Sequence, residues 1–199
     1  MTNVSSTRGS FALVSYIPDP LATVLQRLQH QCGGGSPKPH ITILPPRPLC
    51  MPFNGVWEQV QRTLLAYAPF EVELSDVRCF SETGILYLDI SHGAGLLHDL
   101  HAALNHGDLD YRERFDFRPH LTLTGPLSPE QIKQAKSEAQ ATWSSCNCSR
   151  RFVIEEVVSL WLPNEATDRG WHRVGSHDLR VNLLSNCGDS PAPFNDQTY

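Results

Sequence analysis

Two short segments of the chain carry the residues whose types and spacing best suit chemistry. A histidine followed two positions later by a threonine occurs at His40 and Thr42, and again at His120 and Thr122. In both copies a proline comes first and apolar residues separate the polar ones. Successive side chains of a strand point to opposite faces, so the histidine and threonine of each copy share one face, roughly 6.6 Å apart. That spacing allows both side chains to hold one phosphate.

Two histidines that face one site could perform acid–base catalysis near neutral pH. A neutral imidazole takes a proton and a protonated one gives a proton, and neither step requires a metal ion. In cleavage of a phosphodiester, one histidine would activate water or a ribose hydroxyl, and the other would protonate the departing oxygen. The threonine hydroxyls would hold the non-bridging oxygens. One copy alone would be explained by ordinary strand alternation, but two copies in matching places favour a catalytic pair.

The segments around the two copies repeat one order of elements. The first half is predicted to contain a strand at 11–17, a helix from 21 to the glycines at 33–35, the motif strand from 39, a helix at 56–67 and a strand at 70–80. The second half follows with a strand at 85–90, a helix at 96–104, the motif strand from 119 to 125, a helix from 128 and a strand at 152–158. Pro45, Pro46 and Pro48 are expected to end the first motif strand, because proline lacks the N–H that a central ladder needs.

This repeat predicts an α+β fold made by duplication. We expect two lobes related by approximate twofold symmetry, with two antiparallel sheets lining a central groove and helices on the outside. Residues 1–186 would form this single two-lobed domain, with halves at about 10–82 and 84–182 and an edge strand at 171–174. The Gly, Ser, Pro and Asp content of residues 187–199 predicts a disordered tail.

Composition limits the possible partners. The chain has 199 residues, 40% of them hydrophobic and 19% charged, as in ordinary soluble globular proteins. It contains no apolar run near the roughly 20 residues that span a bilayer, and no secretion signal is recognisable. Six scattered cysteines are expected to be free thiols in the cytoplasm. A net charge of −5 argues against sequence-independent binding along a long nucleic-acid backbone, whereas a small or end-directed nucleotide substrate is compatible with it.

The paired motifs resemble those of the two-histidine (2H) phosphoesterases, especially the 2′-5′ RNA ligase-like and cyclic phosphodiesterase branch. The segments from Pro39 to Pro46 and from Pro119 to Leu123 carry the resemblance, which covers roughly residues 10 to 182. It implies metal-independent action on cyclic or 2′-5′-linked ribonucleotide phosphates, without a cofactor. His40 and His120 would be the acid–base pair, in an order set by how the substrate lies. The family's usual outcome would be hydrolysis to a 2′-phosphomonoester, with ligation as its reverse.

Other residues are weaker candidates for the site. Tyr16, Trp161 and Trp171 could stack on a base, although core packing is the more common role of such rings. Arg118 directly precedes the second motif and could contact phosphate. His98 and His101 are spaced as a possible metal pair on a helix, but no third ligand occurs at a recognised spacing, so no metal is expected.

We therefore expect a monomeric hydrolase that opens a 2′,3′-cyclic phosphate or cleaves a 2′-5′ phosphodiester. A noncatalytic nucleotide- or RNA-binding module with the same groove is the main alternative, although a binder would not need both histidines. A metal-dependent hydrolase that uses some of the nine histidines is the third.

Overall fold

A computed structural model describes residues 9–34, 37–49, 52–163 and 170–181. The predicted tail at 187–199 lies outside these residues. The strands are β1 (Gly9–Tyr16), β2 (His40–Pro48), β3 (Phe70–Cys79), β4 (Leu86–His92), β5 (Leu121–Thr122), β6 (Arg151–Ile154), β7 (Glu156–Pro163) and β8 (His172–Asp178). The helices are α1 (Leu21–Gln31), α2 (Phe53–Leu64), α3 (Ala94–Leu104), the short 3-10 helix η1 (Gly107–Leu109) and α4 (Pro129–Ser145).

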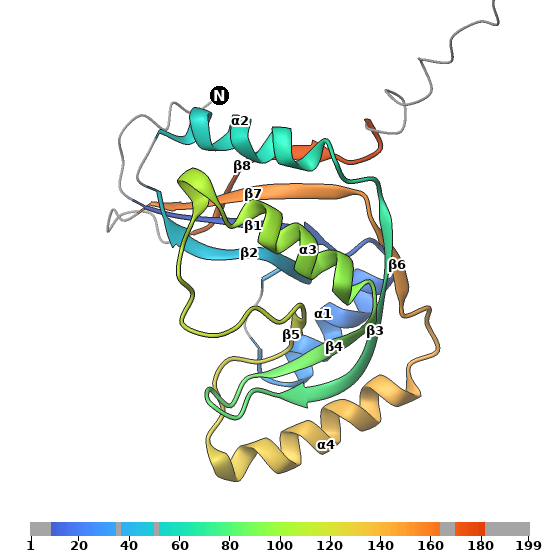
Figure 1. Cartoon of the computed structure of the whole chain (residues 1–199). Helices are drawn as coiled ribbons and strands as arrows, with labels where there is room; N and C mark the ends of the chain where they lie inside the picture. Colours follow the sequence, from blue (N-terminus) through green and yellow to red (C-terminus); the bar gives the residue numbers. More distant parts are fainter. Residues whose placement is uncertain (1–8, 35–36, 50–51, 164–169, 182–199) are drawn as a thin grey trace, which may run out of the picture.

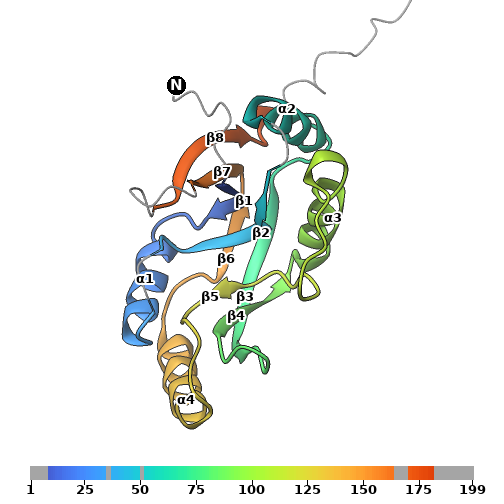
Figure 2. The ribbon, with the colours of Figure 1, turned by 90° about the vertical axis from the view of Figure 1, so that its left-hand side faces the viewer.

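The strands form two four-stranded antiparallel sheets, which confirms the predicted α+β fold (Figure 1). Sheet A has the order β2-β1-β7-β8, and sheet B has the order β5-β4-β3-β6. Each motif strand, β2 or β5, is therefore an edge strand of its sheet. In a view turned by 90°, α1 and α4 lie toward one end of the molecule, and α2 and α3 lie toward the other (Figure 2).

The duplicated halves exchange their third strands. In sheet A, β1 pairs with β2 of its own half and with β7 from the second half. In sheet B, β4 pairs with β5 of its own half and with β3 from the first half. Each sheet thus contains strands from both halves. This exchange binds the two halves together through backbone hydrogen bonds as well as through the core.

The strand predicted at 152–158 proves to be two strands. β6 pairs with β3 in sheet B, and after Glu155 the chain enters sheet A as β7, which pairs with β1 and β8. The apolar run at 152–158 hid this transition, because both strands bury side chains: Phe152 and Ile154 in β6, Val157 and Val158 in β7. The predicted edge strand at 171–174 is confirmed in the longer β8.

The first motif strand does not end at the prolines, as the sequence suggested. β2 extends through Pro45, Pro46 and Pro48, and Arg47 and Pro48 still pair with Phe11 and Ser10 of β1. The reason is its position at the edge of sheet A, since an edge strand has one side without ladder partners and tolerates residues that lack an N–H.

The second motif strand is shorter than predicted, only two residues long. Leu86 explains where it stops. The carbonyl of Leu86 accepts hydrogen bonds from the N–H groups of both Leu123 and Thr124, at 2.8 and 3.3 Å. Its own N–H donates to the Thr124 side-chain oxygen at 3.0 Å instead of to a backbone carbonyl. This side-chain hydrogen bond takes the place of the next backbone hydrogen bond between the two strands.

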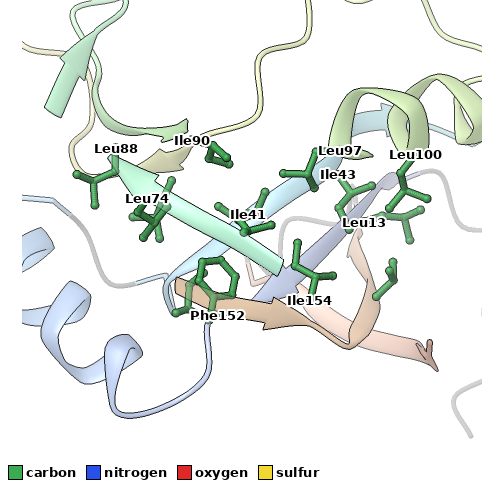
Figure 3. Close-up of a cluster of buried hydrophobic side chains, with 14 of the residues drawn as sticks. Leu13, Ile41, Ile43, Leu74, Leu88, Ile90, Leu97, Leu100, Phe152 and Ile154 are labelled. Carbon is green, nitrogen blue, oxygen red and sulfur yellow. The ribbon is translucent and has the colours of Figure 1, made fainter. Parts of the chain in front are cut away.

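Apolar residues from both sheets and from α3 form one core (Figure 3). Ile41 and Ile43 of β2 are fully buried in it, and Ile43 lies near Leu97 and Leu100 of α3. Because side chains alternate along a strand, the burial of the two isoleucines directs His40 and Thr42 to the opposite face. The hydrophobic core thereby orients the first motif.

α4 begins as its sequence predicts. Pro129 occupies the first turn, and the Gln131 side chain accepts a hydrogen bond from the Ser128 N–H at 3.0 Å, as in a capping box. Trp143 is fully buried and donates its indole N–H to the Ser75 carbonyl at 2.7 Å, which fixes α4 on β3. None of the described helices has the length and apolar character needed to cross a membrane.

Candidate active site

His40 is the first residue of β2, opposite Tyr16 at the end of β1. The two rings meet edge-on, with centroids 6.1 Å apart. The Nδ1 atom of His40 lies 2.7 Å from the carbonyl oxygen of Lys38. Backbone and neighbour together fix the imidazole at the start of the strand.

His120 precedes β5 directly and is held in the same way. Its Nδ1 lies 2.6 Å from the carbonyl oxygen of Arg118, again two residues earlier. Phe80 and Tyr87 stack on each other at 4.1 Å, and both meet the His120 ring edge-on, at 4.9 and 5.3 Å. His120 is thus held between a backbone carbonyl and two aromatic rings.

These matched hydrogen bonds define the tautomer of both histidines. A carbonyl oxygen only accepts, so each Nδ1 must carry the hydrogen. In the neutral ring the proton is then absent from Nε2, which presents a lone pair. Protonation would turn the same Nε2 into a donor, so the arrangement prepares each histidine to act as base or acid through one atom.

Both threonines share the histidine faces, as predicted. Thr42 pairs with Val14 across β1 and is half-buried, and Thr122 pairs with Tyr87 across β4 and is exposed. Among the described residues, neither threonine hydroxyl has a hydrogen-bond partner. Both remain available to donate to an anion. We call His40, Thr42, His120 and Thr122 the histidine site.

The two motifs are close in space although they belong to different sheets. β2 and β5 lie side by side. Burial lowers the pKa of His40, opposed by its hydrogen bond to Lys38. Burial also lowers the pKa of His120. Its hydrogen bond to the Arg118 carbonyl and the negative charge of Asp89 oppose this shift, while the positive charges of His40 and Arg118 add to it. Because protonation of one ring disfavours protonation of the other, the pair favours a state with one proton or none.

Each motif strand is connected to a helix of the other half by one polar side chain. Gln29 of α1 donates its side-chain N–H to the Thr122 carbonyl at 2.9 Å. The Nδ1–H of His101, on α3, donates to the Ile43 carbonyl at 2.9 Å. Both motif strands are edge strands, so one side of each has no neighbouring strand to pair with its backbone carbonyls. These two side chains donate hydrogen bonds to carbonyls of that kind.

A cation lies beside each motif. The guanidinium of Arg118 donates to the Tyr87 hydroxyl at 2.8 Å, which places it next to His120. The ammonium of Lys38 lies 4.7 Å from the centre of the Tyr16 ring, next to His40. Two of the predicted substrate-binding residues, Tyr16 and Arg118, are therefore at the site.

The two tryptophans are not at the histidine site. Trp161 pairs with Phe11, near the opposite end of β1 from Tyr16, and is 6% exposed within the core. Trp161 therefore packs in the core, which was the alternative to stacking on a base. Trp171 precedes β8, whose first residue His172 pairs with Trp161, so it lies at that distant end too; it is 41% exposed.

The possible metal pair has other partners. His101 is buried, stacks on Phe117 at 3.8 Å and lies 3.5 Å from the Glu113 carboxylate through Nε2. His98 meets the Phe117 ring edge-on at 5.5 Å. No group of three or more His, Cys, Asp or Glu residues suited to a metal occurs within the described parts of the chain.

Sequence reasoning missed Lys38, Phe80 and Tyr87. A signal for Lys38 existed, because Lys38-Pro39-His40 and Arg118-Pro119-His120 both place a cation two residues before the histidine. For Phe80 and Tyr87 no comparable signal existed. They meet His120 only because β3 and β4 pair across the turn between them.

Comparisons with known proteins agree with this geometry. The model of the 2′-5′ RNA ligase superfamily matches residues 17–162. No curated protein sequence matches the chain. Among solved structures, apo LigT of E. coli superposes with a TM-score of 0.59 at 11% identity, covering 87% of this chain and 98% of LigT.

Two further structures show the same fold. TT0787 of Thermus thermophilus gives a TM-score of 0.57 at 14% identity, covering 86% of this chain and 98% of that one. E. coli LigT complexed with 3′-AMP gives a TM-score of 0.57 at 11% identity, covering 87% and 98%. At such low identity these likenesses establish the fold alone.

Proposed function

Because the chain belongs to the 2′-5′ RNA ligase superfamily, we propose that it is a metal-independent phosphoesterase acting on a nucleotide or an RNA end. It opens a 2′,3′-cyclic phosphate or cleaves a 2′-5′ phosphodiester by acid–base catalysis between His40 and His120. The matched Nδ1 bonds of the two histidines, at 2.7 and 2.6 Å, are the observation that supports this most strongly. Both Nε2 atoms are left ready for proton transfer.

With a 2′,3′-cyclic phosphate, one histidine removes a proton from water as the new oxygen–phosphorus bond forms. The bond between phosphorus and one ribose oxygen breaks, and the other histidine gives its proton to that oxygen. The product is a phosphomonoester with a free neighbouring hydroxyl. Afterwards the two histidines have exchanged roles, and proton exchange with water restores the starting state. With a ribose hydroxyl in place of water as the nucleophile, the same steps would join that hydroxyl to the phosphate as a phosphodiester, which is ligation.

Thr42 and Thr122 donate to the non-bridging oxygens, whose negative charge increases in the five-coordinate transition state. Arg118 adds a positive charge at the same end of the site, beside His120. Tyr16 offers its ring as a surface for a base. Which histidine is the acid depends on the orientation that the substrate adopts between them.

A substrate panel with chelator present tests the proposal. Purified protein is incubated with 2′,3′-cyclic nucleotides and with 2′-5′ dinucleotides, and the products are identified by chromatography and phosphorus NMR. We expect turnover of at least one class, with full activity in EDTA. Survival of both classes would overturn the proposal. Loss of activity in EDTA would indicate the metal-dependent alternative instead.

A noncatalytic binding module would bind the nucleotides without converting them. Titration calorimetry with the same panel separates this case. Binding without turnover would support the module, whereas turnover abolished by removal of either histidine would exclude it.

A further inference from the structure

We infer that the substrate carries a second phosphate group in addition to the scissile one, and that Lys38 binds it. This rests on the proposed function and specifies the class of its substrate: a nucleotide with a cyclic or 2′-5′-linked phosphate and a further phosphomonoester on the same ribose.

The first step concerns the number of positive charges. Lys38 and Arg118 both lie two residues before a site histidine, and the carbonyl of each accepts that histidine's Nδ1–H. Neither side chain forms an ion pair with any described carboxylate. One imidazolium adds a further positive charge during catalysis, while a cyclic phosphate or a phosphodiester carries a single negative charge. The negative charges of Asp89 and Glu82 act on Arg118, whereas no described carboxylate pairs with Lys38. Lys38 is thus the positive charge that neither the scissile group nor a described carboxylate is seen to balance.

The second step separates the roles of the two cations. Arg118 is fixed by the hydroxyl of Tyr87, whose ring also meets His120 edge-on, so the Arg118 charge lies at the His120 end of the site, beside the scissile phosphate. Lys38 is exposed and lies over Tyr16, on the His40 flank. Its ammonium is held near the site by the aromatic ring, with no oxygen partner among the described residues. It is therefore available for a different anionic group.

The third step is the chemistry of that group. An ammonium on a flexible stem binds phosphate as a point charge, without the planar geometry that an arginine requires. A phosphomonoester carries a charge of about −1.5 to −2 at pH 7 and therefore interacts more strongly with an ammonium than a diester does. The Tyr16 ring beside Lys38 can cover a ribose or base between the two phosphates. A 5′-phosphate of the bound nucleoside matches this description.

Product analogues test the inference without relying on turnover. Adenosine 2′-monophosphate and adenosine 2′,5′-bisphosphate are titrated into the protein by calorimetry at low and at high salt. We expect the bisphosphate to bind about fivefold tighter at low salt, with a smaller ratio at high salt, because an exposed ion pair is weak and screened. Lys38→Gln should bring the ratio close to one. Lys133→Gln, which removes a lysine on α4, should leave it unchanged.

The outcomes distinguish this inference from the proposed function. Equal affinities for the two analogues in the wild-type protein would overturn the inference, even if 2′,3′-cyclic adenosine monophosphate is hydrolysed. A preference that persists in Lys38→Gln would also overturn it, because the second phosphate would then bind elsewhere. Turnover of the cyclic nucleotide, measured separately, reports on the proposed function alone.

Discussion

The Nδ1–H of His101 donates to the backbone carbonyl of Ile43 at 2.9 Å, although the two residues belong to different halves of the chain. Ile43 is fully buried and follows Thr42 in the first motif. The same imidazole stacks on Phe117 at 3.8 Å, three residues before His120. One side chain therefore contacts the segments that carry both histidines of the histidine site. We interpret His101 as a positioning residue.

Replacing His101 tests this role. His101→Leu leaves the buried Ile43 carbonyl without a partner, which costs about 1 to 3 kcal/mol, and it frees β2 to shift against the second motif. We expect kcat to fall about tenfold with little change in KM, since a small displacement of catalytic groups affects the transition state most. The measurement is steady-state kinetics on a 2′,3′-cyclic nucleotide, at a temperature where circular dichroism shows both proteins folded.

His101→Asn is the matched variant, because its side-chain N–H can occupy the position of Nδ1–H. It should recover a large part of kcat, even though it loses the stacking on Phe117. If leucine and asparagine reduced kcat equally, the hydrogen bond to Ile43 would not be the positioning contact.

The catalytic pair itself is expected to respond strongly to mutation. His40→Ala or His120→Ala removes one partner of the proton transfer and should lower kcat/KM by about 10² to 10⁴, the usual contribution of general acid–base catalysis. The double variant should be little worse than either single one, because the two residues act as a unit. His30→Ala, which alters an exposed histidine on α1, serves as the control and should keep full activity. Full activity in either site variant would contradict the mechanism.

The pKa shifts of the pair determine the pH profile. Burial lowers the pKa of both His40 and His120 from the ordinary value of about 6.5. The reaction needs one neutral and one protonated ring, so the maximum of kcat/KM, which reports the free enzyme, should lie below about pH 6.5. A bound phosphate anion favours the imidazolium and moves the kcat profile to higher pH. Measuring both profiles checks this; a kcat/KM maximum well above neutral pH would contradict it.

The same shifts predict how stability depends on pH. A histidine with a lowered pKa in the folded protein binds fewer protons there than in the unfolded chain, so folding stability rises with pH. The stability contribution is complete above about pH 6.5 and is lost as the pH falls toward the folded-state pKa values. Urea denaturation from about pH 7.5 to about pH 5 should show this slope. The slope should be smaller in a His40→Asn, His120→Asn double variant, because the side chains at these two positions then no longer titrate.

Sequence patterns predicted the local features of this protein and missed those that depend on long-range pairing. The alternation of Ile41 and Ile43 with His40 and Thr42 predicts which face each side chain takes, because strand geometry repeats every two residues. The cap at Ser128 is similarly local. The exchange of β3 and β7 between sheets is not encoded in any short pattern. It is favoured only when the whole antiparallel arrangement forms.

The candidate site divides in the same way. Its motif residues were evident because the pattern occurs twice, whereas the partners Phe80, Gln29 and His101 reach the site from remote elements. Trp161 shows the opposite error. An aromatic residue near the closing strands looks suitable for stacking on a base, but its register opposite Phe11 turns it into the core.

A buried arginine on β2 leads to a final prediction about stability. Arg47 is 1% exposed, and it donates to the Glu113 carboxylate at 2.6 Å and to the Leu109 carbonyl at 2.7 Å. It also donates to the side-chain oxygen of Asn105. These contacts attach the segment after α3, which leads to the second motif, to the end of β2. Arg47 is thus occupied within the fold and is not available to a substrate phosphate.

Arg47→Met should lower the free energy of unfolding by about 3 to 5 kcal/mol, because it leaves the Glu113 charge half-buried without its partner. Adding Glu113→Gln should recover part of this loss, since the uncompensated charge disappears. Arg151→Ala, which removes an exposed ion pair with Glu71 and Glu73, is the matched control and should change stability little. Urea denaturation of these variants beside the wild-type protein provides the comparison. If Arg47→Met proved as mild as Arg151→Ala, the buried contacts of Arg47 would not be what fixes the segment after α3 to β2.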